Sequence, residues 1–128
     1  MRQALAFEEW MLAQRARLRE LALQALQTLA AYHAGRGEAG HAAGIDYTTR
    51  LLALEPWREE AHRQLMLLLA RDGQRGAALA QYEACRQVLA EELGVEPEPE
   101  TQALYERIRS GEFAPPPAPV ETPAQTRP

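Results

Sequence analysis

Lysine is absent from this chain of 128 residues, and arginine supplies all fourteen of its strongly basic side chains. Eighteen acidic residues outnumber them, so the formal net charge is −4 at pH 7. Non-specific affinity for duplex DNA comes from a positive face that releases counterions from the phosphates. The composition therefore predicts no direct binding of nucleic acid by this chain.

Cysteine is almost as scarce, because Cys85 is the only one in the sequence. A single thiol excludes an internal disulfide framework and a zinc site built from several thiolates. Long apolar runs are also missing: the longest, LMLLLA at Leu65–Ala70, is far shorter than the roughly eighteen residues of a membrane-spanning helix. The first ten residues reach two glutamates without passing an apolar signal core. These absences predict a cytoplasmic protein with no membrane segment.

Helical periodicity fills most of the sequence, and no segment alternates as a β-strand would. The chain contains strong breaks at the glycine-rich GRGEAG at residues 35–40, at Pro56, at Gly73 and at Gly94. The expected helices are 7–33, 42–53, 58–72, 75–93 and 99–110. In the first of them, the expected core-facing stripe is Leu18, Leu21, Ala25, Leu29 and Tyr32.

An offset of thirty-four residues relates the second and fourth expected helices, and it aligns Gly44 with Ala78 and Thr48 with Tyr82. Thirty-four residues is the period of the tetratricopeptide helix–turn–helix repeat. We expect the small residues Gly44 and Ala78 where paired helices cross most closely, with Tyr82 and Cys85 filling the next grooves. The repeat is degenerate, since Thr48 stands where Tyr82 supplies an aromatic ring. The predicted fold is all-α: a tetratricopeptide-like bundle of about five helices, formed by two degenerate helix pairs and a capping helix.

The last fifteen residues hold six of the nine prolines and almost no apolar anchors. Such a composition predicts a disordered, extended linker or tail. Its PPPAP motif also fits a docking site for a proline-binding module. The predicted organisation is an N-terminal linker at 1–6, one helical domain at 7–111 and a proline-rich tail at 112–128.

No constellation of residues in the sequence supports catalysis. His62 follows Glu59 by one helical turn, but a metal site in a helical bundle needs a second such pair on a facing helix. A surface or interhelical hydrogen bond is the expected role of His62. Cys85 lies on an apolar helical stripe, which favours a buried small hydrophobe over a nucleophile. We therefore expect no enzymatic activity, no metal and no cofactor.

Four segments carry a family resemblance: FEEW at 7–10, LLALEPWREEAHRQLM at 51–66, GQRGAALAQYEACRQVL at 73–89 and EELGVEPEPETQALYERI at 91–108. Together they resemble the bacterial transcriptional activator domain of antibiotic-regulatory-protein-type regulators. The resemblance implies a tetratricopeptide-like domain that follows a winged-helix DNA-binding domain, which this sequence does not include. It also implies roles in dimerisation and in contacts with neighbouring domains and the RNA polymerase machinery.

In helical repeats the first helix of each pair lines the concave face. The residues expected to face a partner are therefore His33, Arg36, Arg63, Leu67 and Arg71. Arginine at such a face suits acidic partner segments through forked hydrogen bonds. An alternative function is a freestanding tetratricopeptide-type adaptor unrelated to transcription, and a weaker one is a small helical enzyme or metal carrier.

Overall fold

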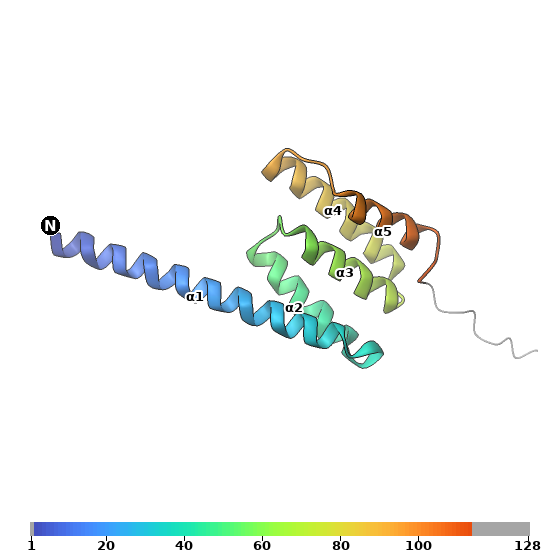
Figure 1. The fold of residues 1–128 in the computed structure, drawn as a ribbon, viewed down its shortest axis with the longest axis horizontal. Helices are drawn as coiled ribbons and strands as arrows, with labels where there is room; N and C mark the ends of the chain where they lie inside the picture. The colour runs from blue at the N-terminus through green and yellow to red at the C-terminus, as the bar shows by residue number, and fades with distance from the viewer. Residues whose placement is uncertain (1, 114–128) are drawn as a thin grey trace, which may run out of the picture.

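The computed structural model describes residues 2–113, which form five α-helices and one short 3₁₀-helix and contain no strand (Figure 1). The elements are α1 (Arg2–Ala34), η1 (Gly37–Gly40), α2 (His41–Leu54), α3 (Glu59–Arg71), α4 (Arg75–Leu93) and α5 (Pro99–Arg109). The predicted all-α fold is confirmed. The predicted proline-rich tail, 112–128, falls almost entirely in residues 114–128, which lie outside the described residues.

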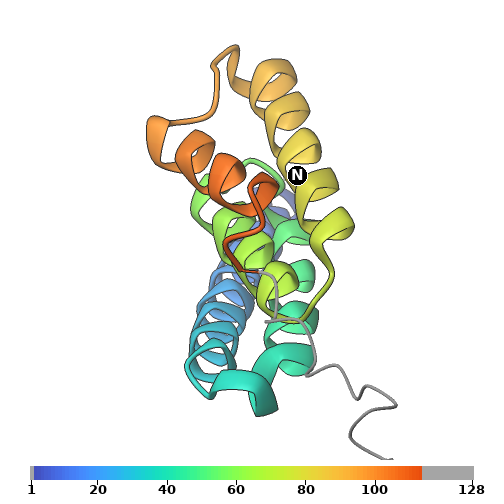
Figure 2. The same cartoon turned by 90° about the vertical axis from the view of Figure 1, so that its right-hand side faces the viewer.

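The helices stack in sequence order, with α1 against α2, α2 against α3, α3 against α4, and α5 against both α3 and α4. Figure 2 shows α1 and α2 at one end of the stack, α3 in its middle and α4 with α5 at the other end. This is the predicted arrangement of two helix pairs closed by a capping helix. Within residues 2–113, no helix has the length and apolar character that a membrane crossing requires.

Both ends of the helical domain differ from the sequence-based boundaries. The helix α1 begins at Arg2 rather than Phe7, because residues 2–6 contain good helix formers and neither glycine nor proline. Residues 2–6 are therefore helix rather than a separate linker. At the other end, Glu112 and Phe113 belong with the bundle: Glu112 pairs with an arginine of α5, and Phe113 packs against the core.

A glycine ends each helix of the second pair, α3 and α4. Both Gly73, after α3, and Gly94, after α4, have positive φ angles, of 84° and 66°. Residues with a Cβ rarely adopt this left-handed conformation, so glycine is the residue that ends a helix in this way. The α4 boundaries, Arg75 and Leu93, coincide with those predicted from sequence.

The small residues of the repeat lie inside the stack. Gly44 is buried in α2, and a Cβ at this position would lie 3.0 Å from Leu68 Cδ1 of α3 and 3.5 Å from the Ala34 nitrogen of α1. Ala78 and Cys85 of α4 are fully buried. Tyr82 stacks on Tyr105 of α5, with ring centroids 4.2 Å apart. Close approach at Gly44 thus lets α2 fit between α1 and α3.

The predicted core-facing stripe of α1 is wrong. Leu18 and Tyr32 are 64% and 63% exposed, while the buried residues of α1 are Leu23 and Ala30. The helix carries two apolar stripes, and periodicity does not tell which one faces α2. The guanidinium of Arg19 donates to the Leu54 carbonyl at the end of α2. The part of α1 before this contact extends beyond the bundle (Figure 1).

Candidate protein-binding groove

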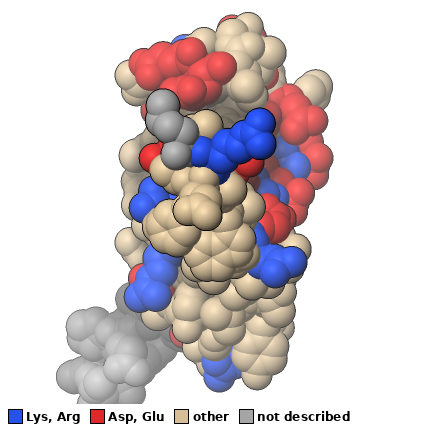
Figure 3. Space-filling model, turned by 90° about the vertical axis from the view of Figure 1, so that its left-hand side faces the viewer, with Lys and Arg blue, Asp and Glu red and all other residues tan. Residues whose placement is uncertain are grey.

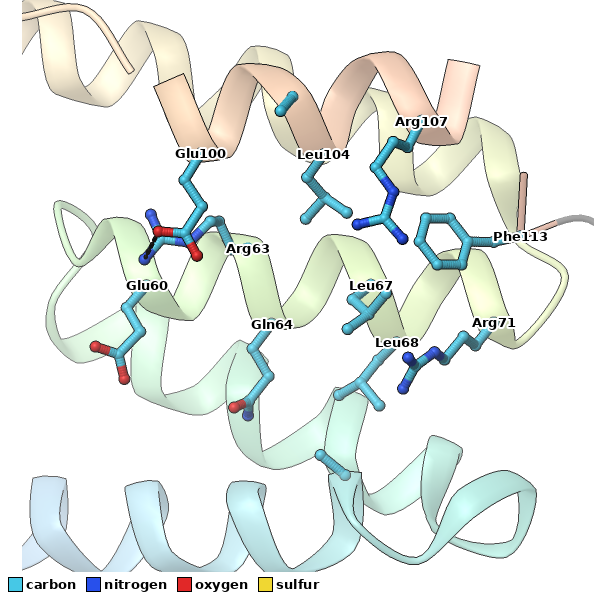
Figure 4. Close-up of a pocket in the computed structure, with 12 residues that line it drawn as sticks. Glu60, Arg63, Gln64, Leu67, Leu68, Arg71, Glu100, Leu104, Arg107 and Phe113 are labelled. Atoms are coloured by element: carbon cyan, nitrogen blue, oxygen red, sulfur yellow. Dashed lines mark ion pairs between the residues drawn. The ribbon is translucent and has the colours of Figure 1, made fainter. Parts of the chain in front are cut away.

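A groove of about 520 Å³ lies between α3 and α5 (Figure 4). Leu67 of α3 faces Leu104 of α5 across it, and Phe113 closes one end. Leu68 also lines the groove, but its side chain points toward α2 and is almost fully buried. These four side chains make the interior of the groove mainly apolar. Most of the other lining residues are charged or polar, so the groove combines an apolar floor with a charged rim, as ligand-binding and peptide-binding sites commonly do.

Helical spacing places the α3 side of the groove on one face. Glu60, Gln64, Leu67 and Arg71 follow one another at intervals of four, three and four residues. Glu100 and Arg107 occupy the equivalent positions at the two ends of the α5 wall. Side chains of α3 therefore line one side of the groove, and side chains of α5 line the other.

The rim carries opposite charge at its two ends. The helices α3 and α5 both start at one end, where Glu60 and Glu100 lie, and both finish at the other end, with Arg71 and Arg107 (Figure 4). Acidic residues in the first turn and basic residues in the last turn complement the helix dipole, which explains this distribution. The groove is therefore acidic at one end and basic at the other.

Arg63 lines the acidic end, but its guanidinium forms hydrogen bonds and ion pairs with residues of the bundle. Its guanidinium donates to Thr101 Oγ1 at 3.0 Å and pairs with Glu98 at 3.3 Å and Glu100 at 3.8 Å. The Glu59 carboxylate, 3.9 Å from the same guanidinium, accepts hydrogen bonds from the Glu98 amide and the Thr101 hydroxyl. This network joins the start of α3 to the start of α5. Arg63 therefore positions the groove walls.

At the basic end, the two arginines differ in whether they form ion pairs within the fold. Arg107 pairs with Glu112, and its guanidinium lies 4.8 Å from the centre of the Phe113 ring. Arg71, in contrast, takes part in none of the ion pairs formed among residues 2–113. Among the residues that the structure describes, Arg71 is therefore the basic residue of this rim whose charge is available to a partner.

Two of the predicted partner-facing residues lie outside the groove. His33, near the end of α1, is half-buried and stacks on Tyr47 of α2 with ring centroids 5.4 Å apart. The guanidinium of Arg36 donates to His33 Nδ1 at 3.1 Å and lies over the Tyr32 ring. The structure thus brings Arg63, Leu67 and Arg71 together and separates His33 and Arg36 from them.

His62 is buried in α3 with both ring nitrogens hydrogen-bonded. Its Nε2 lies 2.6 Å from the Pro56 carbonyl, and its Nδ1 lies 2.7 Å from Gln81 Nε2 of α4. A carbonyl only accepts and an amide NH₂ only donates, so the ring is neutral with its proton on Nε2. Burial lowers the pKa of His62, although the Pro56 carbonyl and the nearby Glu59 charge oppose the shift. His62 therefore links α3 to α4 through its hydrogen bond with Gln81.

The lowered pKa of His62 predicts that the fold weakens as the pH falls. Near pH 6 the unfolded chain, whose histidine pKa is about 6.5, binds more protons than the folded chain. The contribution of His62 to the free energy of unfolding is therefore complete above about pH 6.5 and declines below it, by at most about 1.4 kcal/mol per pH unit.

Urea denaturation from pH 7.5 to pH 5 measures this effect, with His62→Gln as the comparison. The difference in unfolding free energy between the two proteins should shrink toward low pH, because the variant lacks the titrating ring. A difference that stays constant across this range would contradict the assignment of a depressed pKa to His62.

The environment of Cys85 does not favour a role as a nucleophile. Burial raises the pKa of its thiol to about 12, with the Glu59 charge acting in the same direction and Arg63 against it. A thiol with this pKa is almost entirely protonated at neutral pH, so it is a poor nucleophile. Residues 2–113 also contain no group of three or more His, Cys, Asp or Glu side chains arranged to hold a metal ion.

Comparison with known proteins places these features in a family. The sequence matches the family described as the bacterial transcriptional activator domain over residues 2–109, which is almost all of the described chain. The chain belongs to this family. Membership supports a role in transcription regulation and agrees with the resemblance found in the four sequence segments.

Curated relatives of this activator domain are transcriptional regulators. It is 43% identical to the regulatory protein AfsR of Streptomyces coelicolor over 95 residues, which are 74% of this chain and 9% of that protein. Identity to AfsR of Streptomyces griseus is 42% over 95 residues, 74% of this chain and 10% of that protein. Identity to the transcriptional regulatory protein MoaR1 of Mycobacterium bovis is 41% over 81 residues, 59% of this chain and 26% of that protein. The chain spans about a tenth of AfsR and a quarter of MoaR1, and no solved structure matches it.

Sequence reasoning missed half of the groove in this activator domain. Repeat geometry predicted Arg63, Leu67 and Arg71 as partner-facing residues, and all three line the α3 wall, but the opposite wall depends on how α5 packs back onto α3. A signal for that wall was present in the sequence: Leu104 and Arg107 repeat the apolar–basic order of Leu67 and Arg71. Phe113 was assigned to the proline-rich tail because the prolines begin two residues later.

Proposed function

We propose that this chain is a non-catalytic interaction module of a bacterial transcriptional regulator, and that it acts by presenting the α3–α5 groove to a protein segment. DNA binding would reside in a winged-helix domain, and the module would support activation through contacts with neighbouring domains or with the RNA polymerase machinery. Such a module works in the cytoplasm. The single observation that carries the proposal is an apolar groove with an available arginine in a member of the activator-domain family.

The chemistry of the groove indicates what it would bind. An amphipathic helix or extended segment would place its apolar side chains against Leu67, Leu104 and Phe113. An acidic residue of the partner would meet Arg71, and a basic residue would meet Glu60 and Glu100 at the other end. Because the two ends have opposite charge, the groove would select one direction of the bound segment.

A fusion experiment tests this function with the chain as it is. The chain is joined to an unrelated winged-helix DNA-binding domain whose operator controls a reporter gene. We expect the fusion to raise transcription above the level reached with the DNA-binding domain alone. Arg71→Glu should remove at least half of this gain, since it reverses the available charge at the basic end of the groove.

Arg86→Glu is the matched control, because Arg86 is an exposed arginine of α4 that lies outside the groove. This variant should activate as the unchanged fusion does, and circular dichroism would show that both variants are folded. The proposal would be contradicted by a fusion that never exceeds the DNA-binding domain alone, or by Arg71→Glu and Arg86→Glu activating equally.

A further inference from the structure

The basic end of the groove holds a second arginine whose charge is already paired within the chain. The guanidinium of Arg107 donates to the Glu112 carboxylate through Nε, at 2.7 Å, and through Nη2. Arg107 and Arg71 both line this end of the groove, from the α5 wall and the α3 wall (Figure 4). A bound segment would therefore meet two arginines at this end, of which one already has a carboxylate.

Glu112 lies in the turn that ends α5, and its backbone is fixed there. Its amide donates to the Arg107 carbonyl at 3.1 Å, and Gly111 before it has a φ angle of 87°. This is the hydrogen-bond pattern with which a glycine closes a helix. The side chain of Glu112, in contrast, is about half exposed, so it can rotate into solvent while the backbone stays in place. Release of Arg107 by Glu112 therefore needs no change of fold.

Phe113 keeps Arg107 at the groove when Glu112 is released. The ring centre of Phe113 lies 4.8 Å from the Arg107 guanidinium, and Phe113 also packs against the hydrophobic core. A guanidinium over an aromatic face is attracted to the ring, and this attraction does not depend on Glu112. Arg107 therefore stays at the basic end of the groove with its charge unpaired.

The ion pair between Arg107 and Glu112 is of a kind that a partner can replace. Exposed pairs contribute little to stability, because water and salt screen the charges and two long side chains lose freedom. A carboxylate of a segment bound in the groove would meet the same guanidinium with less water around it, where the attraction between the charges is stronger. The partner's carboxylate would therefore displace that of Glu112.

We propose that the basic end of the groove binds two acidic side chains of one protein segment, one on Arg71 and one on Arg107, and that Glu112 competes for Arg107. This inference rests on the proposed function, because it adds a second acidic residue to the segment that the groove binds. Competition by Glu112 would lower the affinity for all segments that need Arg107. The groove would then favour segments with an acidic pair over segments with one acidic residue.

The charges around the groove direct an acidic pair to this end. Residues 87–106 contain six glutamates and no basic residue. Figure 3 shows acidic side chains gathered at the top of the molecule, where α4 connects to α5, and an acidic pair would be repelled there. At the basic end, Asp72 follows Arg71 in sequence, but its carboxylate lies 3.5 Å from His41 Nδ1 and accepts a hydrogen bond from Gln74.

The pair within the chain also indicates which group suits Arg107. Both hydrogen bonds of its guanidinium go to a carboxylate, that of Glu112. Arg71 lies on the opposite wall, so each arginine would take a carboxylate of its own (Figure 4). A phosphorylated side chain bound by both arginines is the competing occupant, and the experiment below distinguishes the two.

A peptide library supplies the probe for a direct test. Random ten-residue peptides displayed on phage are selected on the immobilised full chain, after depletion on the Leu67→Glu variant. Depletion removes peptides that bind outside the groove, because Leu67 lines it. We expect the selected peptides to carry two acidic residues close together, beside apolar residues.

Fluorescence anisotropy then gives the dissociation constant of the tightest selected peptide for the chain and its variants. Arg71→Gln and Arg107→Gln should each raise it about 5–10-fold, whereas Glu112→Gln should lower it about 2–5-fold, because the competing carboxylate is gone. Replacing each acidic residue of the peptide by glutamine in turn should give one peptide that no longer responds to Glu112→Gln. Circular dichroism shows that the variants are folded.

The ion pair between Arg109 and Glu106 in α5 provides the matched control. Its side chains are 60% and 59% exposed, against 52% and 49% for Arg107 and Glu112, but neither residue lines the groove. Glu106→Gln changes the net charge as Glu112→Gln does, and it should leave the dissociation constant unchanged. Equal tightening by the two variants would show a general effect of charge and overturn the competition by Glu112.

The possible failures of this inference and of the proposed function differ. Peptides that respond to Arg71→Gln but not to Arg107→Gln or Glu112→Gln would overturn the inference and leave the proposed function standing. Tighter binding after one phosphoserine replaces the acidic pair would also overturn it, in favour of a phosphate site. A library that yields no peptide sensitive to Leu67→Glu would contradict the proposed function, and the inference with it.

Discussion

Gly40→Ala is expected to destabilise the fold by about 2–4 kcal/mol, because the added methyl group has no space. A Cβ on Gly40 would lie 1.9 Å from the His33 carbonyl oxygen and 2.9 Å from the Arg36 Cβ. The obstacle at His33 is backbone, so no side-chain rotation relieves the clash. The φ angle of Gly40, −99°, is ordinary for any residue, which means that the cost comes from space alone. Residues 33–40 would have to move to accept alanine.

Gly76→Ala is the matched comparison, since nothing lies within 4 Å of a Cβ at this position near the start of α4. Alanine should be favoured there by up to about 1 kcal/mol, because it has the higher helix propensity. Urea denaturation of both variants gives the two unfolding free energies. If the two substitutions changed stability by the same amount, or if Gly40→Ala had no effect, the packing of the α1–α2 connection would not be as described.

Leu68→Ala is expected to cost about 2–5 kcal/mol of unfolding free energy. Leu68 is 2% exposed, and its Cδ1 atom occupies the space that the missing side chain of Gly44 leaves open. Removing it would create a cavity where α3 packs against Gly44 of α2, and the buried surroundings have little freedom to collapse. A double variant that adds Gly44→Ala should recover part of the loss, because the new methyl group would enter the cavity.

Leu67→Ala provides the control for this site. Leu67 is the next residue along α3, but it is only partly buried and lines the open groove. Its truncation should cost about 1 kcal/mol or less and leave the fold intact. Thermal and urea unfolding distinguish the two leucines. Equal losses at Leu67 and Leu68 would contradict the contact between Leu68 and Gly44.

Helix type and helix ends in α2 to α5 could be predicted because their signals are local. Gly73 and Gly94 supply the left-handed turns that end α3 and α4, and Pro99 starts α5. The orientation of α1 could not be predicted in the same way. Two apolar stripes on one helix have equal periodicity, and only the packing of α2 decides that Leu23 is buried while Leu18 is not.

The candidate site was predicted to the extent that it follows from one helix. Leu67 and Arg71 were predicted to face a partner by repeat geometry, and their spacing of four residues puts them on one face of α3. Leu104 and Arg107 carry the local pattern of the α5 wall, but its place opposite α3 depends on the long-range network in which Glu59 and Arg63 hold the start of α5. His33 was grouped with the groove residues by repeat geometry, yet stacking on Tyr47 places it elsewhere.

Amide hydrogen exchange on the chain tests most directly whether it acts by presenting a protein-binding surface. Exchange would be compared for the chain alone, with the DNA-binding domain and RNA polymerase of a matched regulator system, and with promoter DNA alone. The account predicts slower exchange along α3 and α5 around Leu67, Leu104 and Arg71 in the presence of the proteins, and no change with DNA alone. Protection by promoter DNA alone, or unchanged exchange in α3 and α5 when the proteins bind, would contradict it.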